Sequence, residues 1–133
     1  MEKCFTNEAR RRWQYFAHQD LQMAELALNE GIYNQVCFHS QQCVEKCLKG
    51  LLAGLGQKTP RTHSIVDLLR ILQNIQQIEC IGDLRESMEL MDIYYIPTRY
   101  PEALPGSLAD GMPELDDAIT AITTARACWQ KLG

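Results

Sequence analysis

The stretch Tyr33–Leu55, YNQVCFHSQQCVEKCLKGLLAGL, decides the fold that this chain is predicted to adopt. Its apolar and small residues recur at intervals of three and four, which places them on one wide face of an α-helix. That predicted core face consists of Val36, Ser40, Cys43, Val44, Cys47, Leu48, Leu51, Leu52 and Leu55. The opposite side of the helix carries Phe38, Gln42, Glu45, Lys46 and Lys49. A helix with so broad an apolar face needs several other elements to cover it.

A second long helix is predicted upstream, from about Asn7 to Asn29, and Gly31 follows it as a helix-ending glycine. Its core stripe consists of Trp13, Ala17, Asp20, Leu21, Ala24 and Leu28. Asp20 lies among apolar neighbours, and a carboxylate in that position requires a partner. His63 is one candidate for the partner of the Asp20 carboxylate.

Two further helices are predicted after the loop 56–63. Ser64, with Asp67 three residues on, resembles a capping box at the start of a helix that ends near Gln76. Its inward residues are predicted to be Ile65, Leu68, Leu69, Leu72 and Ile75. The next helix is predicted from about Gly82 to Tyr95, with an apolar stripe made of Leu84, Met88, Met91 and Tyr95.

The segment from Pro97 to Gly111 contains three prolines and is predicted to be an irregular loop. Pro113 suits the first turn of a last helix, and acidic residues follow it near the positive end of the helix dipole. The core side of that helix is predicted to consist of Leu115, Ala118, Ile119, Ile122 and Trp129. The pattern therefore predicts an all-α, up-and-down bundle of four main helices plus a shorter fifth.

The length of 133 residues suits a single helical domain over residues 1–133. A net charge of −4 excludes a protein that holds nucleic acid through its overall field, so such a role needs a local patch. No apolar run approaches the roughly 18 residues that a membrane helix needs, and the first residues do not resemble a secretory signal. We therefore expect a cytoplasmic protein without a membrane segment.

Six cysteines are present, and their spacing matches no zinc-binding pattern. Cys37, Cys43 and Cys47 lie within one predicted helix, separated by six and four residues. Buried cysteines of this kind usually fill small spaces in a core. We expect reduced thiols, no metal site and no cofactor.

Four stretches together resemble one family: Asp20–Tyr33, Phe38–Leu52, Thr62-His63 with the helix start that follows, and Tyr95–Pro101 with the sequence YIPTRYP. In this combination the chain resembles the HEPN domain proteins of bacteria and archaea. The resemblance implies a bundle of four main helices with a shorter one, a homodimer, and pairing with a nucleotidyltransferase-domain protein. Many relatives are toxins that cut RNA without metal, while others are thought to bind nucleotides or to act as interaction modules.

The RNA-cutting relatives carry an arginine followed, after four to six residues, by a histidine. Arg99 has no histidine after it, because His63 is the last histidine of the chain. A formal match runs from Arg12 to His18, but a separation of six residues turns the two side chains about 120° apart on a helix. We interpret that match as coincidence, and the resemblance therefore leans towards a protein that is not an enzyme.

Arg99 is the strongest single candidate for a binding site, because its planar guanidinium fits phosphate. Tyr95 and Tyr100 are candidates to stack on a base, and Lys46 and Lys49 are candidates to contact phosphate. His63 with Arg99 is the candidate catalytic pair. Each candidate also has a structural alternative. His63 could fix the loop before the third helix, and the tyrosines could fill the end of the bundle. The lysines could lie on a solvated face, with Glu45 and Lys49 paired one helical turn apart.

The predicted function is one half of a two-component, toxin–antitoxin-like pair with a nucleotidyltransferase-like partner, in contact with nucleotide or RNA. One alternative is a metal-independent endoribonuclease toxin that uses Arg99 and His63. Another alternative is a non-catalytic protein-interaction scaffold.

Overall fold

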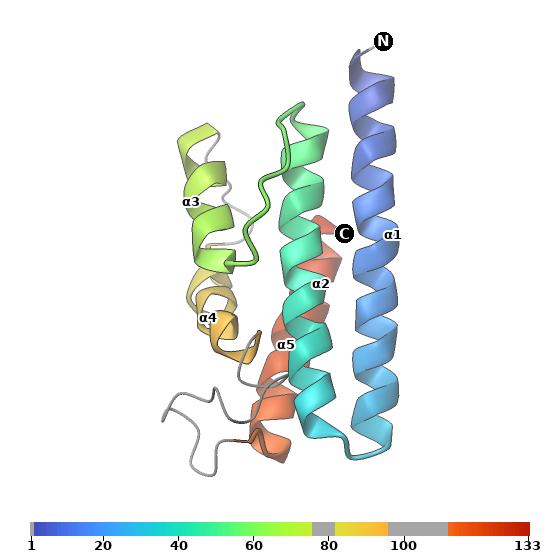
Figure 1. Cartoon of the computed structure of the whole chain (residues 1–133), viewed down its shortest axis with the longest axis vertical. Helices are drawn as coiled ribbons and strands as arrows, with labels where there is room; N and C mark the ends of the chain where they lie inside the picture. Colours follow the sequence, from blue (N-terminus) through green and yellow to red (C-terminus); the bar gives the residue numbers. More distant parts are fainter. Residues whose placement is uncertain (1, 76–81, 96–111) are drawn as a thin grey trace.

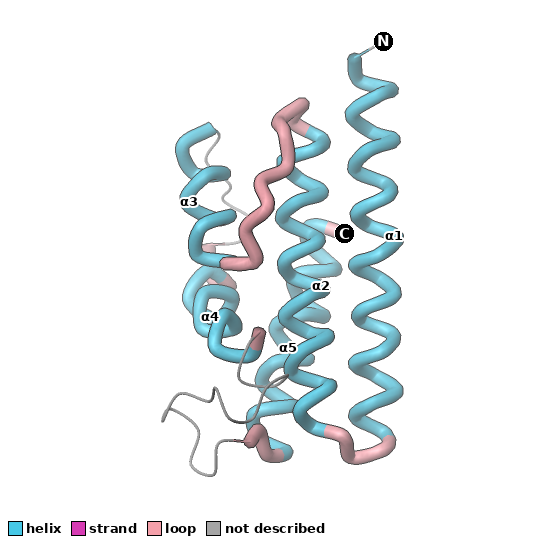
Figure 2. Tube along the Cα trace, in the orientation of Figure 1, coloured by secondary structure: helices cyan, strands magenta, loops and turns pink. Residues whose placement is uncertain are grey.

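The structure is a computed structural model that describes residues 2–75, 82–95 and 112–133, with side chains described from residue 8 onward. Its elements are α1 (Glu2–Asn29), α2 (Tyr33–Gly54), α3 (Ile65–Ile75), α4 (Arg85–Leu90), the 3-10 helix η2 (Met91–Tyr94) and α5 (Leu115–Leu132). All regular structure within the described residues is helical (Figure 2). The predicted all-α bundle, with four main helices and a shorter one, is confirmed.

Helix α2 lies at the centre of the arrangement (Figure 1). The long helix α1 runs antiparallel beside it, α3 and α4 lie on the side away from α1, and α5 packs behind α2. The largest buried side chains come from α2, α3, α4, η2 and α5, and they include Leu48, Leu52, Leu68, Leu69, Leu72, Met88, Met91 and Ile122. The broad apolar face predicted for α2 is therefore covered from three directions.

Three predicted helix boundaries differ from those observed. The predicted helix from Gly82 to Tyr95 is a short α-helix followed by a 3-10 turn, with a turn ahead of it. Pro113 precedes α5 rather than occupying its first turn, because Glu114 is the N-cap and forms a reciprocal capping box with Asp117. Helix α1 also begins earlier than predicted, at Glu2, although its end at Asn29 is confirmed. The predicted loop 97–111 lies outside the described residues.

Some residues predicted to face the core are exposed. Leu55 and Ile75 are 38% and 41% exposed, Leu55 directly after the end of α2 and Ile75 at the end of α3. On α5 the prediction of Leu115 and Ile119 as core residues was wrong, because both are exposed. That helix packs through small side chains instead, which allows a close approach to α2. Its buried residues are Ala118, Ala121, Ile122, Thr124, Ala125, Cys128 and Leu132.

Two glycines set how α1 meets α2. Gly31 has a φ of 72°, a left-handed conformation that suits glycine, and the Ile32 amide donates to the Ala27 carbonyl across the turn. Gly50 lies against α1, since a Cβ there would be 3.2 Å from Cβ of Trp13. The tight turn and this close contact hold the two helices side by side along most of α2. Among the helices that the structure describes, none has an apolar stretch long enough to cross a lipid bilayer.

Candidate functional site

The polar face of α2 contacts α1 on one side and the loop that leads into α3 on the other. We define this face by Phe38, His39, Gln42, Glu45, Lys46 and Lys49. Glu45 is 2% exposed and Lys49 is 5% exposed. The alternative prediction of a solvated face was therefore wrong at these two positions, although the Glu45–Lys49 pair itself is confirmed, with Nζ 3.1 Å from Oε2. Buried charges of this kind are retained only when they are paired.

On the side towards α1, Asp20 joins the polar face. His39 Nδ1 lies 2.8 Å from Asp20 Oδ1, and Lys46 Nζ donates to Asp20 Oδ2. The carboxylate is thus held by two partners, both from α2. This corrects the expectation that His63 pairs with Asp20, because His63 lies on the other side of α2 and contacts Glu45.

On the side towards α3, Glu45 is the centre of the second polar group. Both its carboxylate oxygens lie 3.3 Å from His63 Nδ1, and it accepts further hydrogen bonds from Lys49 and from Gln42 Nε2. The Lys49 ammonium also lies 5.6 Å from the centroid of the Trp13 ring, within the range of a cation–π contact. Glu45 therefore has a fully satisfied carboxylate that fixes one nitrogen of His63.

His63 is the exposed member of this group. Its side chain is 52% exposed, and its ring stacks on Tyr95 with 4.7 Å between ring centroids and an interplanar angle of 14°. Gln41, fully buried, donates to the His63 carbonyl and fixes the backbone at the same point. Within the described residues, Nε2 of His63 has no hydrogen-bond partner. The result is an imidazole held on one side and open on the other.

Asp92 of η2 holds the junction between the loop and α3, a contact that the sequence analysis did not predict. Its carboxylate accepts from the Ser64 hydroxyl and from the backbone amides of Ile65 and Val66 at 3.0, 2.7 and 3.1 Å. Of the predicted capping box, only the bond from the Asp67 amide to Ser64 Oγ is present. The carboxylate that caps α3 belongs to Asp92 of η2, which lies 28 residues after Ser64. A search for local capping motifs therefore cannot find it.

A family model for the HEPN domain matches residues 11–132 of this chain. The chain belongs to the HEPN domain family. The resemblance inferred from the motif combination is thereby confirmed. This HEPN chain is also 30% identical, over 103 residues, to a protein of Methanocaldococcus jannaschii named "Putative toxin MJ1304". The match covers 74% of this chain and 67% of that protein.

Two solved structures share the fold of this HEPN chain. The crystal structure of TT1696 from Thermus thermophilus has a TM-score of 0.78 and 36% identity, covering 92% of this chain and 94% of the other. The crystal structure of ST0689, an archaeal HEPN homologue, has a TM-score of 0.69 and 30% identity, covering 91% and 92%. The helical bundle is thus the family fold over nearly the whole chain.

The structure brings some of the predicted site residues of this HEPN chain together. Tyr95 and His63 are stacked, and Lys49 reaches the same carboxylate as His63. Lys46 lies on the other side of α2 with Asp20, so the two lysines serve separate carboxylates. Phosphate binding by these lysines stays a prediction.

Other candidates are placed apart or are not described. Arg99 and Tyr100 lie outside the described residues. The Arg12–His18 match is separated on α1, since Arg12 pairs with Glu8 at 3.6 Å while the His18 ring lies against Trp129 of α5. The interpretation of that match as coincidence agrees with the positions of the two side chains.

The described cysteines are buried and free: Cys37, Cys43, Cys47 and Cys128. Burial, with a smaller contribution from the charge of Asp117, raises the pKa of the Cys37 thiol to about 12. Hydrogen bonding between neighbouring thiols and burial raise the pKa values of Cys43 and Cys47. Among the described residues, no group of three or more potential ligands is arranged to hold a metal ion. Cys37, Cys43 and Cys47 therefore act as core side chains, because the reactive thiolate form is suppressed.

We expect the four buried thiols to resist modification in the folded protein. In a Cys4→Ser/Cys80→Ser variant, which isolates these four cysteines, a chromogenic disulfide reagent at pH 8 should label them only as fast as the chain unfolds. In urea all four should react within the mixing time. The free energy of unfolding should also fall as pH rises above about 9, because the unfolded chain then loses the protons of Cys37, Cys43 and Cys47 that the folded chain keeps. Rapid labelling under native conditions would contradict the burial described above.

Proposed function

We propose that this protein is the HEPN component of a two-component, toxin–antitoxin-like pair with a nucleotidyltransferase-like partner, and that it acts as a homodimer contacting nucleotide or RNA. The family membership and the similarity to a protein named as a putative toxin support the first part of this proposal. The arrangement around His63 supports the second part.

The observation that carries the proposal is the half-exposed His63 ring, fixed by the buried Glu45 and stacked on Tyr95. A flat pair of rings offers a surface on which a base can stack, and base–aromatic stacking contributes about 1 to 3 kcal/mol per base. The open nitrogen of His63 can donate to or accept from a phosphate or a base. Arg99 and Tyr100 follow Tyr95 closely in the sequence, and we include them in the proposed contact surface.

A binding experiment tests this surface. Polarisation of a labelled single-stranded RNA, and titration with ATP and GTP, should reveal binding by the wild type. We expect Tyr95→Ala to weaken RNA binding by about tenfold, the equivalent of one lost stacking contact, and Arg99→Ala to abolish nucleotide binding. Arg70→Ala, a change at an exposed arginine of α3, is the matched control and should leave binding unchanged. Wild-type levels of binding in the Tyr95 and Arg99 variants would refute the proposed surface.

The Glu45–His63 contact favours a second candidate function, a metal-independent endoribonuclease. A carboxylate that holds one imidazole nitrogen leaves the other available as a general base, which is the arrangement that proton-transfer catalysis requires. The same RNA samples, incubated with EDTA, separate the two functions. Cleavage that is lost in His63→Gln but retained in His39→Gln would establish the enzyme, whereas binding without cleavage supports the non-catalytic role.

A further inference from the structure

The outward side of α1 carries a row of residues spaced alternately by four and three positions. This spacing brings the row to one face of the helix and is the repeat by which one helix packs along another. We call these residues the α1 seam: Arg12, Phe16, Gln19, Met23, Leu26 and, in the turn directly after α1, Glu30. Phe16, Met23 and Leu26 are 50%, 49% and 60% exposed, although each is a large apolar side chain. Three such residues in register on one exposed face indicate a surface that another helix covers.

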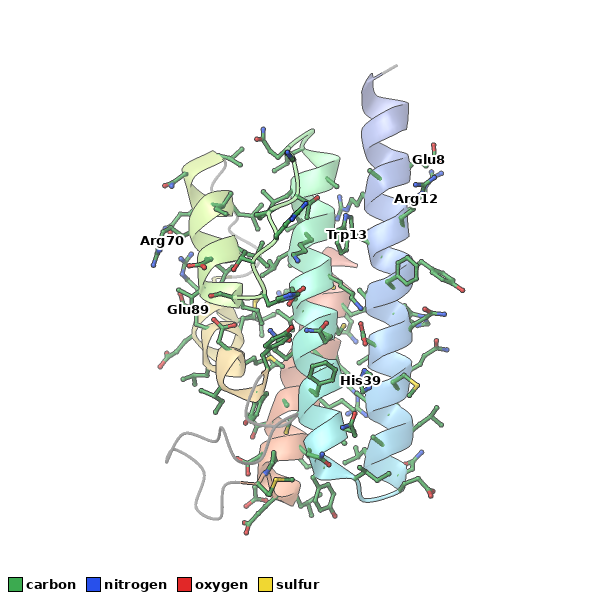
Figure 3. All side chains as sticks on the ribbon, in the orientation of Figure 1. Glu8, Arg12, Trp13, His39, Arg70 and Glu89 are labelled. Carbon is green, nitrogen blue, oxygen red and sulfur yellow. The ribbon has the colours of Figure 1, made fainter. Side chains whose placement is uncertain are left out.

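The charges at the two ends of the α1 seam are opposite. Arg12 lies near the start of the seam and points away from the bundle, as Figure 3 shows, while Glu30 ends it. A parallel pairing of two identical seams would place each charge next to its like. An antiparallel pairing about a two-fold axis places each charge next to its opposite, which makes the seam self-complementary.

We propose that the α1 seam is the face on which a second copy of this chain docks, with the two α1 helices antiparallel. In the register that the charges require, Arg12 lies opposite the partner's Glu30. Phe16 then lies opposite the partner's Leu26, and Gln19 lies opposite the partner's Met23. The register thus pairs charge with opposite charge at the ends and apolar with apolar at Phe16 and Leu26, with Gln19 against Met23 at the centre.

A shallow groove next to the seam supports this register. It lies between the end of α1 and the start of α2, and Met23, Leu26, Ile32 and His39 are among the residues that line it. In this register the partner's Phe16 would lie against Leu26, which lines this groove. Its entry would cover His39, which holds Asp20, so the second copy would shield the Asp20–His39 contact from water.

This inference rests on the homodimer of the proposed function and names its face. Sedimentation velocity over a dilution series measures the dimer dissociation constant. Arg12→Glu and Glu30→Arg each replace two symmetric attractions by two repulsions, and each should weaken the dimer by about tenfold or more. The Arg12→Glu/Glu30→Arg double variant restores opposite charges and should return the constant to within about threefold of the wild type. Circular dichroism verifies that every variant is folded.

Arg11→Glu is the matched control, because it makes the same charge change at an exposed position about 100° around the helix. It should leave the dimer unchanged. A wild-type dimer that neither single charge change weakens would overturn the α1 seam but leave the homodimer standing, as would a double variant weaker than both singles. A wild type that stays monomeric at all concentrations would overturn both.

Discussion

Replacing Glu45 with alanine is expected to lower the free energy of unfolding by about 3 to 5 kcal/mol, the range for removing one partner of a buried ion pair. The carboxylate is 2% exposed and neutralises Lys49, which is 5% exposed. Without it, the Lys49 ammonium would remain buried beside the Trp13 ring, without the carboxylate that neutralises it. Urea unfolding followed by far-ultraviolet circular dichroism measures the change.

The matched control for this prediction is Glu8→Ala. Glu8 also pairs with a cation one turn away, Arg12, but its side chain is 67% exposed. Exposed pairs of this type contribute about 1 kcal/mol or less, so the control should unfold nearly as the wild type does. A loss for Glu45→Ala as small as that of the control would show that the pair is hydrated and that its burial is not maintained in solution.

The double variant Glu45→Ala/Lys49→Met separates the cost of leaving the Lys49 charge unpaired from the cost of truncating the Glu45 side chain. Removing the unpaired ammonium should recover part of the lost stability, so the double variant should be more stable than Glu45→Ala alone. His63 provides a second measurement, since loss of Glu45 frees its Nδ1. The RNA affinity of a folded Lys49→Met variant, in which Glu45 still holds His63, should therefore exceed that of Glu45→Ala.

Much of the fold follows from patterns within single helices. The apolar face of Tyr33–Leu55 and the stripe of the helix before it predict two long antiparallel helices, and both are observed. The pairing of Glu45 with Lys49 was also predictable, because residues four apart meet on a helix. Its burial was not predictable, since the covering groups are Trp13 of α1 and His63 of the following loop. Local spacing contains no information about those long-range contacts.

The partners of Asp20 could have been predicted from the sequence. Asp20 lies eleven residues before the turn glycine Gly31, and Gln42 lies eleven residues after it. In an antiparallel pair joined by a short turn, residues equally far from the turn lie side by side. His39 and Lys46 flank Gln42 by three and four positions on the same helix face, and both contact Asp20. Counting outward from the turn would have selected them instead of His63.

Asp92→Ala is the second large prediction, with an expected loss of about 2 to 3 kcal/mol in the free energy of unfolding. One carboxylate accepts three hydrogen bonds at the start of α3, two of them from backbone amides that otherwise have no partner in the helix. Loss of a helix cap costs about 0.5 to 2 kcal/mol, and bonds to a charged acceptor lie at the upper end of hydrogen-bond contributions. Asp83→Ala, at an exposed aspartate of the same segment, is the matched control and should cost less than about 0.5 kcal/mol.

Asp92 also affects the candidate site, because it lies close in sequence to one of the two stacked rings and bonds to the residue next to the other. Asp92 lies three residues before Tyr95, and Ser64 directly follows His63, so this carboxylate ties together the two segments whose rings stack. Asp92→Asn keeps one carbonyl oxygen as an acceptor and should retain part of the stability while loosening the junction. We therefore expect Asp92→Asn to weaken RNA binding although it alters no group of the binding surface. Hydrogen exchange of the Ile65 and Val66 amides should rise in the same variant. Unchanged exchange at these two amides would show that another acceptor caps α3, and Asp92 would then have no role in positioning His63.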